Sequence, residues 1–276
     1  MDLINTQLTA PEIEKLSQAV TLLNAPTLTD KMVKYVGKPI ESLFKYLPDN
    51  AEKKIGSAVR LALDKASDVA SWKMSNTVQE ASPKTHKLFA GISGAVGGFF
   101  GISAILAELP VSTVIMMRAI MDIARSEGFD INSEEVQLEC LKVFALENDN
   151  SKLTKGNSEN EAETGYFAVR AALAESLNNQ GTKVASKIIE TVAARFSVTV
   201  TDKVAAQLVP VIGAVSGATI NLMFTDYYQD MARGHFIIKR LTDQYGETAV
   251  KATYTELKLR MFPQTITTAV EIQSST

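Results

Sequence analysis

Cysteine and histidine are scarce in this chain of 276 residues, and each scarcity excludes a class of site. The single cysteine, Cys140, cannot form an internal disulfide and is typical of a reducing compartment. We therefore expect it to be a small buried hydrophobic residue. The two histidines, His86 and His235, cannot build a histidine-rich zinc site, so any metal would rest mainly on carboxylates.

An excess of charge and a targeting signal are also missing. The formal net charge is −3, and no stripe of Arg and Lys with interleaved aromatic residues is present, which argues against nucleic acid as a partner. The N-terminal stretch MDLINTQLTAPEIEKL has neither the basic nor the apolar region of a secretory signal. We therefore expect a cytoplasmic protein.

The sequence favours helix almost throughout, because helix-forming residues are frequent and strand-like alternation is scarce. We predict an all-α fold: a single multi-helix domain with a central pair of glycine-rich apolar helices. Residues 1–80 should form N-terminal helices that pack on the core, 81–262 the helical core, and 263–276 a loosely held tail. Outside the central pair, helices are predicted at 10–23 after a Thr9–Glu12 capping box, from Thr29-Asp30 to Gly37, at 51–72, 133–146 and 165–178, once or twice within 182–208, and at 235–245 and 247–261.

The central pair is predicted from two apolar runs. The first, 88–127, has glycines at 91, 94, 97, 98 and 101, a small-xxx-small spacing that allows close helix packing. We expect a break near Glu108-Leu109-Pro110 and an end at Gly128. The second run begins at Pro210. We expect the two runs to be central and antiparallel.

Both apolar runs end in the same way, with Asp-x-Ala-Arg. Residues at i, i+4 and i+7 share a helix face, so each run carries three charges on one face. These are Arg118, Asp122 and Arg125 in the first run, and Asp226, Asp230 and Arg233 in the second. Complementary charges predict that Arg118 meets Asp226 or Asp230, and that Asp122 meets Arg233. Apolar flanks favour a buried network, although exposed ion pairs and a functional site are alternatives.

Several segments of the chain resemble the EcsC family of bacterial proteins. They are the glycine-rich run 91–101 and segments 107–130, 138–146, 165–174 and 209–236. The resemblance covers most of the chain after about residue 50 and implies a mostly helical bacterial protein, but no established reaction or ligand. The polar residues inside these segments are the candidates for a polar network or ligand site: Glu108, Arg118, Asp122, Arg125, Glu139, Asp226, Asp230, Arg233 and His235.

The first functional hypothesis is a cytoplasmic, membrane-associated accessory or interaction protein without its own catalysis. It is built on a buried Asp/Arg network and works at the inner face of the membrane. Residues 88–107 carry no charge and reach the length of a membrane span, although their glycines and missing anchors equally fit a buried hairpin. Its partners would be a membrane surface, lipid or another protein. The sequence sets no oligomeric state.

The alternative is a metal-dependent, hydrolase-like enzyme that uses a carboxylate cluster of Glu108, Asp122, Asp226, Asp230 and His235, with Glu139 nearby. If a divalent metal binds, Asp122, Asp226, Asp230 and His235 are its expected ligands. No HExxH motif and no P-loop supports this hypothesis, and no catalytic residue is assigned. A third hypothesis is a pocket between helices, lined by methionines, that binds a peptide or lipid.

Overall fold

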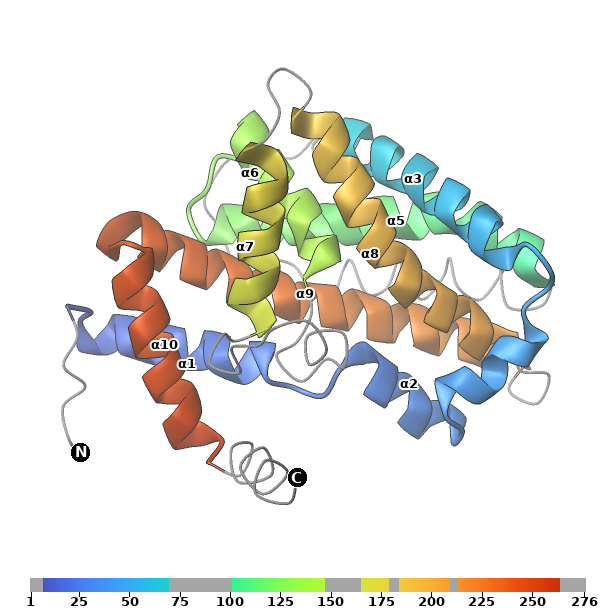
Figure 1. Cartoon of the computed structure of the whole chain (residues 1–276), viewed down its shortest axis with the longest axis horizontal. Coiled ribbons are helices and arrows are strands. Elements are labelled where there is room, and N and C mark those ends of the chain that lie inside the picture. Colours follow the sequence, from blue (N-terminus) through green and yellow to red (C-terminus); the bar gives the residue numbers. More distant parts are fainter. Residues whose placement is uncertain (1–6, 70–100, 147–164, 179–183, 209–212, 264–276) are drawn as a thin grey trace, which may run out of the picture.

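The structure is a computed structural model that describes residues 7–69, 101–146, 165–178, 184–208 and 213–263 (Figure 1). Within these ranges the regular structure is entirely helical and confirms the predicted all-α fold. The α-helices are α1 (Ala10–Leu23), α2 (Leu28–Val36), α3 (Ala51–Val69), α5 (Gly101–Ser126), α6 (Glu134–Lys142), α7 (Gly165–Asn178), α8 (Val184–Gln207), α9 (Gly213–Tyr245) and α10 (Glu247–Met261). Two 3₁₀ helices, η1 (Ile40–Tyr46) and η2 (Val143–Ala145), complete the list.

Helix ends follow local capping rules. Thr9 and Glu12 form the predicted capping box at the start of α1, with the Thr9 backbone N–H donating to Glu12 Oε2 at 2.8 Å. The same arrangement of Thr27 and Asp30 starts α2, two residues earlier than the predicted Thr29-Asp30. Glycines in the left-handed region end α2 and follow α5, as expected from Gly37 and Gly128.

Helix α5 continues through Pro110, so the predicted break at Glu108-Leu109-Pro110 is wrong. A proline inside a helix costs about 3 kcal/mol. Both sides of Pro110 nevertheless bury apolar side chains in the same core, including Leu109 before it and Met116 after it. Their burial offsets the cost of the proline, because each fully buried large apolar side chain contributes roughly 1.5–3 kcal/mol.

Helix α9 is likewise continuous through Gly234, whereas a separate helix over 235–245 was expected. The glycine has a packing role here instead of ending a helix. A Cβ atom at position 234 would lie 2.8 Å from Leu23 Cγ, which is closer than real Cβ contacts allow. Gly234 therefore lets α1 approach α9 closely.

Helices α5 and α9 pack against each other and run in the same direction (Figure 1). Towards their N-terminal ends, Asn221 Nδ2 donates to Glu108 Oε1 at 2.9 Å. At their other ends, Arg240 Nε donates to Glu127 Oε2 at 3.2 Å. Both bonds join residues 113 positions apart, so one parallel register holds along the pair. The predicted antiparallel arrangement is therefore wrong.

The described helices share one hydrophobic core. Helix α1 packs against α9 and α10, while α3 packs against α5 and α8, so the N-terminal helices contribute to the same core as the rest. Phe144 is buried in this core, and its ring centroid lies 5.0 Å from that of Phe196 and 5.1 Å from that of Tyr228. The glycines at 91, 94, 97 and 98, the polar stretch 148–164 and the tail after Pro263 lie outside the described residues.

Replacing Gly234 by alanine is expected to destabilise the protein by about 1–3 kcal/mol through overpacking. Alanine favours a helix over glycine by about 1 kcal/mol, but Leu23 is fully buried and has little room to move. Urea unfolding measures the change. When Leu23→Ala is present, Gly234→Ala should no longer destabilise, because the clash is gone. A more stable Gly234→Ala single variant would contradict this explanation.

Candidate functional site

The nine candidate residues lie on three helices. Helix α5 carries Glu108, Arg118, Asp122 and Arg125, α6 carries Glu139, and α9 carries Asp226, Asp230, Arg233 and His235. Three sets of contacts involve these candidates: Glu108 with Lys203 and Asn221, Asp122 with Arg125, and Glu139 with His235.

The Glu108 group ties three helices together. Lys203 of α8 is 1% exposed, and its Nζ lies 3.5 Å from Glu108 Oε2. Asn221 of α9 donates to the other carboxylate oxygen. A buried ion pair with an added hydrogen bond is strongly unfavourable to break from one side. This group therefore has a structural role, holding α5, α8 and α9 together.

The Asp122 group forms within α5. Asp122 and Arg125 are both buried and form a hydrogen-bonded ion pair one turn apart. The expected pair of Asp122 with Arg233 is not formed, since Arg233 makes no ion pair with any residue that the structure describes. Asp122 pairs instead with Arg125, one turn further along its own helix.

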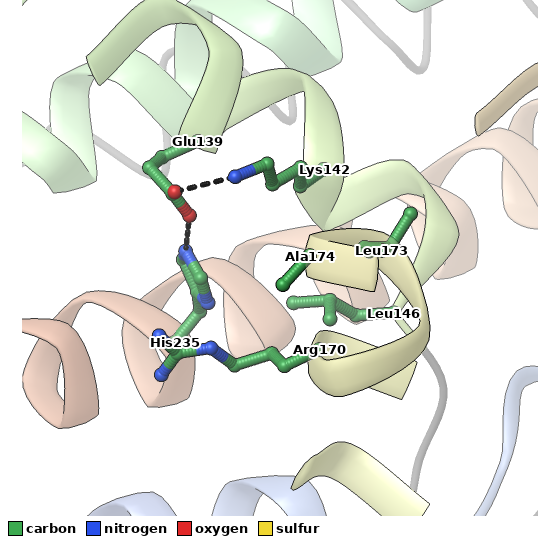
Figure 2. A pocket seen from close by; sticks show the side chains of 7 residues that line it. All are labelled: Glu139, Lys142, Leu146, Arg170, Leu173, Ala174 and His235. Atoms are coloured by element: carbon green, nitrogen blue, oxygen red, sulfur yellow. Dashed lines mark hydrogen bonds and ion pairs between the residues drawn. The ribbon is translucent and has the colours of Figure 1, made fainter. Parts of the chain in front are cut away.

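Glu139 and His235 line a pocket of about 160 Å³ (Figure 2). Lys142 of α6 and Arg170 of α7 supply its other charged groups. Its apolar wall consists of Leu146, Leu173 and Ala174. Three helices therefore converge here, and each contributes at least one charged or titratable side chain.

A chain of hydrogen bonds runs along one side of the pocket. His235 Nε2 lies 3.1 Å from Glu139 Oε2, and His235 Nδ1 lies 2.9 Å from the Tyr166 hydroxyl. Lys142 Nζ donates to Glu139 Oε1 at 2.7 Å, so both oxygens of the carboxylate accept a bond. Arg170 contacts Tyr166 from the far side, with its guanidinium carbon 5.8 Å from the ring centroid.

The protonation states of Glu139 and His235 decide which atom donates in each of these hydrogen bonds. Burial would raise the pKa of Glu139, but His235 and Lys142 lower that pKa well below its usual range, so the carboxylate is ionised. Burial lowers the pKa of His235, and Glu139 raises it by less, so the imidazole is neutral at pH 7. Facing an ionised acceptor, Nε2 must carry the proton, which leaves Nδ1 to accept from Tyr166.

Arg170 retains unused hydrogen-bonding capacity. Burial lowers the pKa of Arg170, but Tyr166 and Glu139 raise it by more, so the guanidinium is charged. Its Nη1 atom is buried and has no hydrogen-bond partner among the described residues. A buried donor on a charged group without an acceptor is costly, and such groups call for an explanation.

The donor set for a metal does not assemble in the described ranges. No three His, Cys, Asp or Glu side chains come together there in a way that could hold a metal ion. Both ring nitrogens of His235 are already bonded. Cys140 is buried as expected, and burial together with the nearby Glu139 raises the pKa of its thiol well above the usual value, so it is not a reactive thiolate.

The sequence candidates omit three residues of this site: Lys142, Tyr166 and Arg170. Each lies in a segment that carries the family resemblance, and the available signal was their helical spacing. Lys142 follows Glu139 by three positions and Arg170 follows Tyr166 by four, so each pair shares a helix face. That spacing alone is equally typical of a solvated face.

Removing the Asp122 carboxylate is expected to cost about 3–5 kcal/mol of unfolding free energy, because it breaks the buried ion pair with Arg125 from one side. Asp122→Ala and wild type are compared by urea unfolding. Glu256→Ala is the matched control, since Glu256 and Arg260 form an exposed pair with 39% and 45% of their side-chain areas accessible. That control should cost under about 1 kcal/mol. Equal effects of the two variants would contradict the distinction.

Acidification should destabilise the protein from about pH 6.5 downwards. The unfolded chain protonates His235 near its ordinary pKa of 6.5, whereas burial keeps the folded imidazole neutral to lower pH. In that window the unfolded state binds more protons, so stability falls as pH falls. Glu139 adds to the loss below its ordinary pKa of 4.5. Urea unfolding at pH 7.5, 6.5 and 5.5 should show a shallower decline for His235→Gln than for wild type; parallel declines would refute the role of His235.

Comparison with known proteins matches the chain to a protein family. Residues 9–241 match the model of the EcsC protein family. No curated protein and no solved structure matches the chain. The matched range begins just before α1, includes the first helices that were less clearly matched from sequence, and contains every residue of the pocket. Because this range covers most of the chain, the protein belongs to the EcsC protein family.

Proposed function

We propose that the protein is a non-enzymatic accessory protein that binds a small molecule in the Glu139–His235 pocket and works beside the cytosolic face of a membrane. The observation that carries the proposal is the pocket itself. It is a hollow of about 160 Å³ that is partly open to solvent, and its acid and base groups are already bonded to one another.

The bonding of these groups argues for binding over acid–base catalysis. A general base needs an available lone pair near the substrate and a pKa near the working pH. The lone pair of His235 Nδ1 is engaged by Tyr166, and the Glu139 carboxylate has a strongly lowered pKa, which makes it a weak base. The pocket therefore supports recognition of a ligand better than proton transfer.

The membrane part of the proposal rests on helix α5 and its neighbour α3. Of the described helices, α5 is the one long and apolar enough to cross a bilayer, but half of its most apolar stretch is buried in the protein. Val111 of α5 is 55% exposed and Leu61 of α3 is 50% exposed. Partial burial with some exposed apolar residues favours contact with a membrane surface over a permanent span.

A pocket-filling variant tests ligand binding. Ala174 lines the pocket, so Ala174→Phe should occupy the space of a bound molecule. Ala172→Phe, two positions earlier on the same helix, is exposed and does not line the pocket. In native mass spectrometry, wild type and Ala172→Phe should retain the same co-purifying small molecule, and Ala174→Phe should lose it. Retention by all three variants would show that the molecule binds elsewhere.

Vesicle flotation tests membrane association. The purified protein should float with vesicles that contain anionic lipid, and Leu61→Glu with Val111→Glu should reduce the floating fraction several-fold, because charge opposes burial in a lipid interface. Exposed Leu259 on α10 provides the control Leu259→Glu, which should float like wild type. Wild-type protein that stays in the soluble fraction with and without anionic lipid contradicts this part of the proposal.

A further inference from the structure

We propose that the ligand of this pocket is a small organic oxyanion, bound through its carboxylate or phosphate group between Lys142 and Arg170. The inference rests on the proposed function and names the class of molecule that the pocket takes. Three properties of the site support it: its charge, its unused donors and its size.

The charged side chains that line the pocket sum to an excess of positive charge. Lys142 and Glu139 form an ion pair at 2.7 Å and offset each other. His235 is neutral, and its one N–H donates to Glu139. Arg170 remains, and it forms no ion pair in the described part of the chain, although Glu139 and the exposed Glu247 influence it at longer range. One negative charge on a ligand would balance the site.

The unused hydrogen-bonding groups are donors. An ammonium group has three N–H donors, and the described contacts of Lys142 account for one of them. Arg170 Nη1 has no acceptor among the described residues. Both oxygens of Glu139 already accept bonds. A ligand that fits this set must bring acceptors, and a charged oxygen acceptor forms the strongest bonds with guanidinium and ammonium groups.

Reaching Nη1 requires a small movement. The atom is shielded from solvent, while Arg170 itself lines the pocket beside His235 (Figure 2). Rotation of the guanidinium towards the pocket would exchange a donor without an acceptor for a charge-assisted bond. The ligand therefore supplies the partner that the protein does not.

The size and the apolar wall limit the rest of the ligand. A cavity of about 150 Å³ holds a molecule the size of benzene, and this pocket has about 160 Å³. Leu146 and Leu173 are almost fully buried and offer an apolar surface opposite the charges. The arrangement fits a short aliphatic carboxylate or a small phosphate, and it excludes polymers such as nucleic acid from full entry.

Titration calorimetry with matched probes tests the inference. Butyrate and inorganic phosphate are the two oxyanion probes, butyramide is the neutral counterpart of butyrate, and sodium chloride keeps the ionic strength constant. At least one oxyanion should bind wild type, and butyramide should not. Arg170→Gln should weaken that binding about ten- to a hundredfold, the loss expected for a hydrogen bond to a charged group. Arg170→Lys should fall between the two, because it keeps the charge but loses the planar fork.

The control and the contrary outcomes separate the possible sources of a signal. Arg60→Gln removes an exposed arginine that pairs with Glu190 on the surface, and it should bind like wild type. Binding of butyrate alone identifies the carboxylate class, and binding of phosphate alone identifies the phosphate class. Absence of oxyanion binding, or binding that survives Arg170→Gln in a folded variant, overturns the inference. If butyramide binds instead and Ala174→Phe abolishes that binding, the pocket is a ligand site as proposed but not an oxyanion site.

Discussion

The parallel packing of α9 against α5 is the constraint on which the described structure depends. Helix α9 has 33 residues and packs against α1, α2, α5 and α10. Its bonds to α5 near Glu108 and at Glu127 fix both its position and its direction. Helix α6 follows the end of α5 after a short turn, so the same packing brings Glu139 of α6 to His235 of α9. The pocket is therefore a product of helix register and not of a local motif.

Local features of the fold could be predicted from sequence because their causes are local. The Thr9–Glu12 capping box, the left-handed glycines and the bounds of α10 each depend on a few neighbouring residues. The expected break at Pro110 and the expected separate helix over 235–245 failed for the opposite reason. Burial on both sides of Pro110 outweighs its local cost, and Gly234 is explained by Leu23, which is distant in sequence. The antiparallel packing predicted for α5 and α9 was wrong for a similar reason, since an apolar stripe looks the same whether the partner helix runs parallel or antiparallel.

The site was predictable only in part. Glu139 and His235 stood out as polar residues in segments rich in apolar residues, and the structure brings them together. Lys142 and Arg170 did not, because a cation one turn from another polar residue is common on solvated helix faces. Only the packing of α6, α7 and α9 shows that these faces point into one pocket (Figure 2). The repeated Asp-x-Ala-Arg pattern drew attention to Asp122, which pairs with Arg125 of its own helix and not with the predicted Arg233.

The direction of the hydrogen-bond chain has a consequence for how the site responds. Arg170 bonds to Tyr166, Tyr166 to His235, and His235 to Glu139, with every hydrogen pointing towards the same carboxylate. If one of these hydrogen bonds reversed its donor and acceptor, the others would have to reverse as well. A molecule that draws Arg170 away from Tyr166 would therefore alter the polarisation of the imidazole and of the carboxylate on α6. In this way a binding event at α7 would reach the Glu139 carboxylate on α6 through His235 of α9.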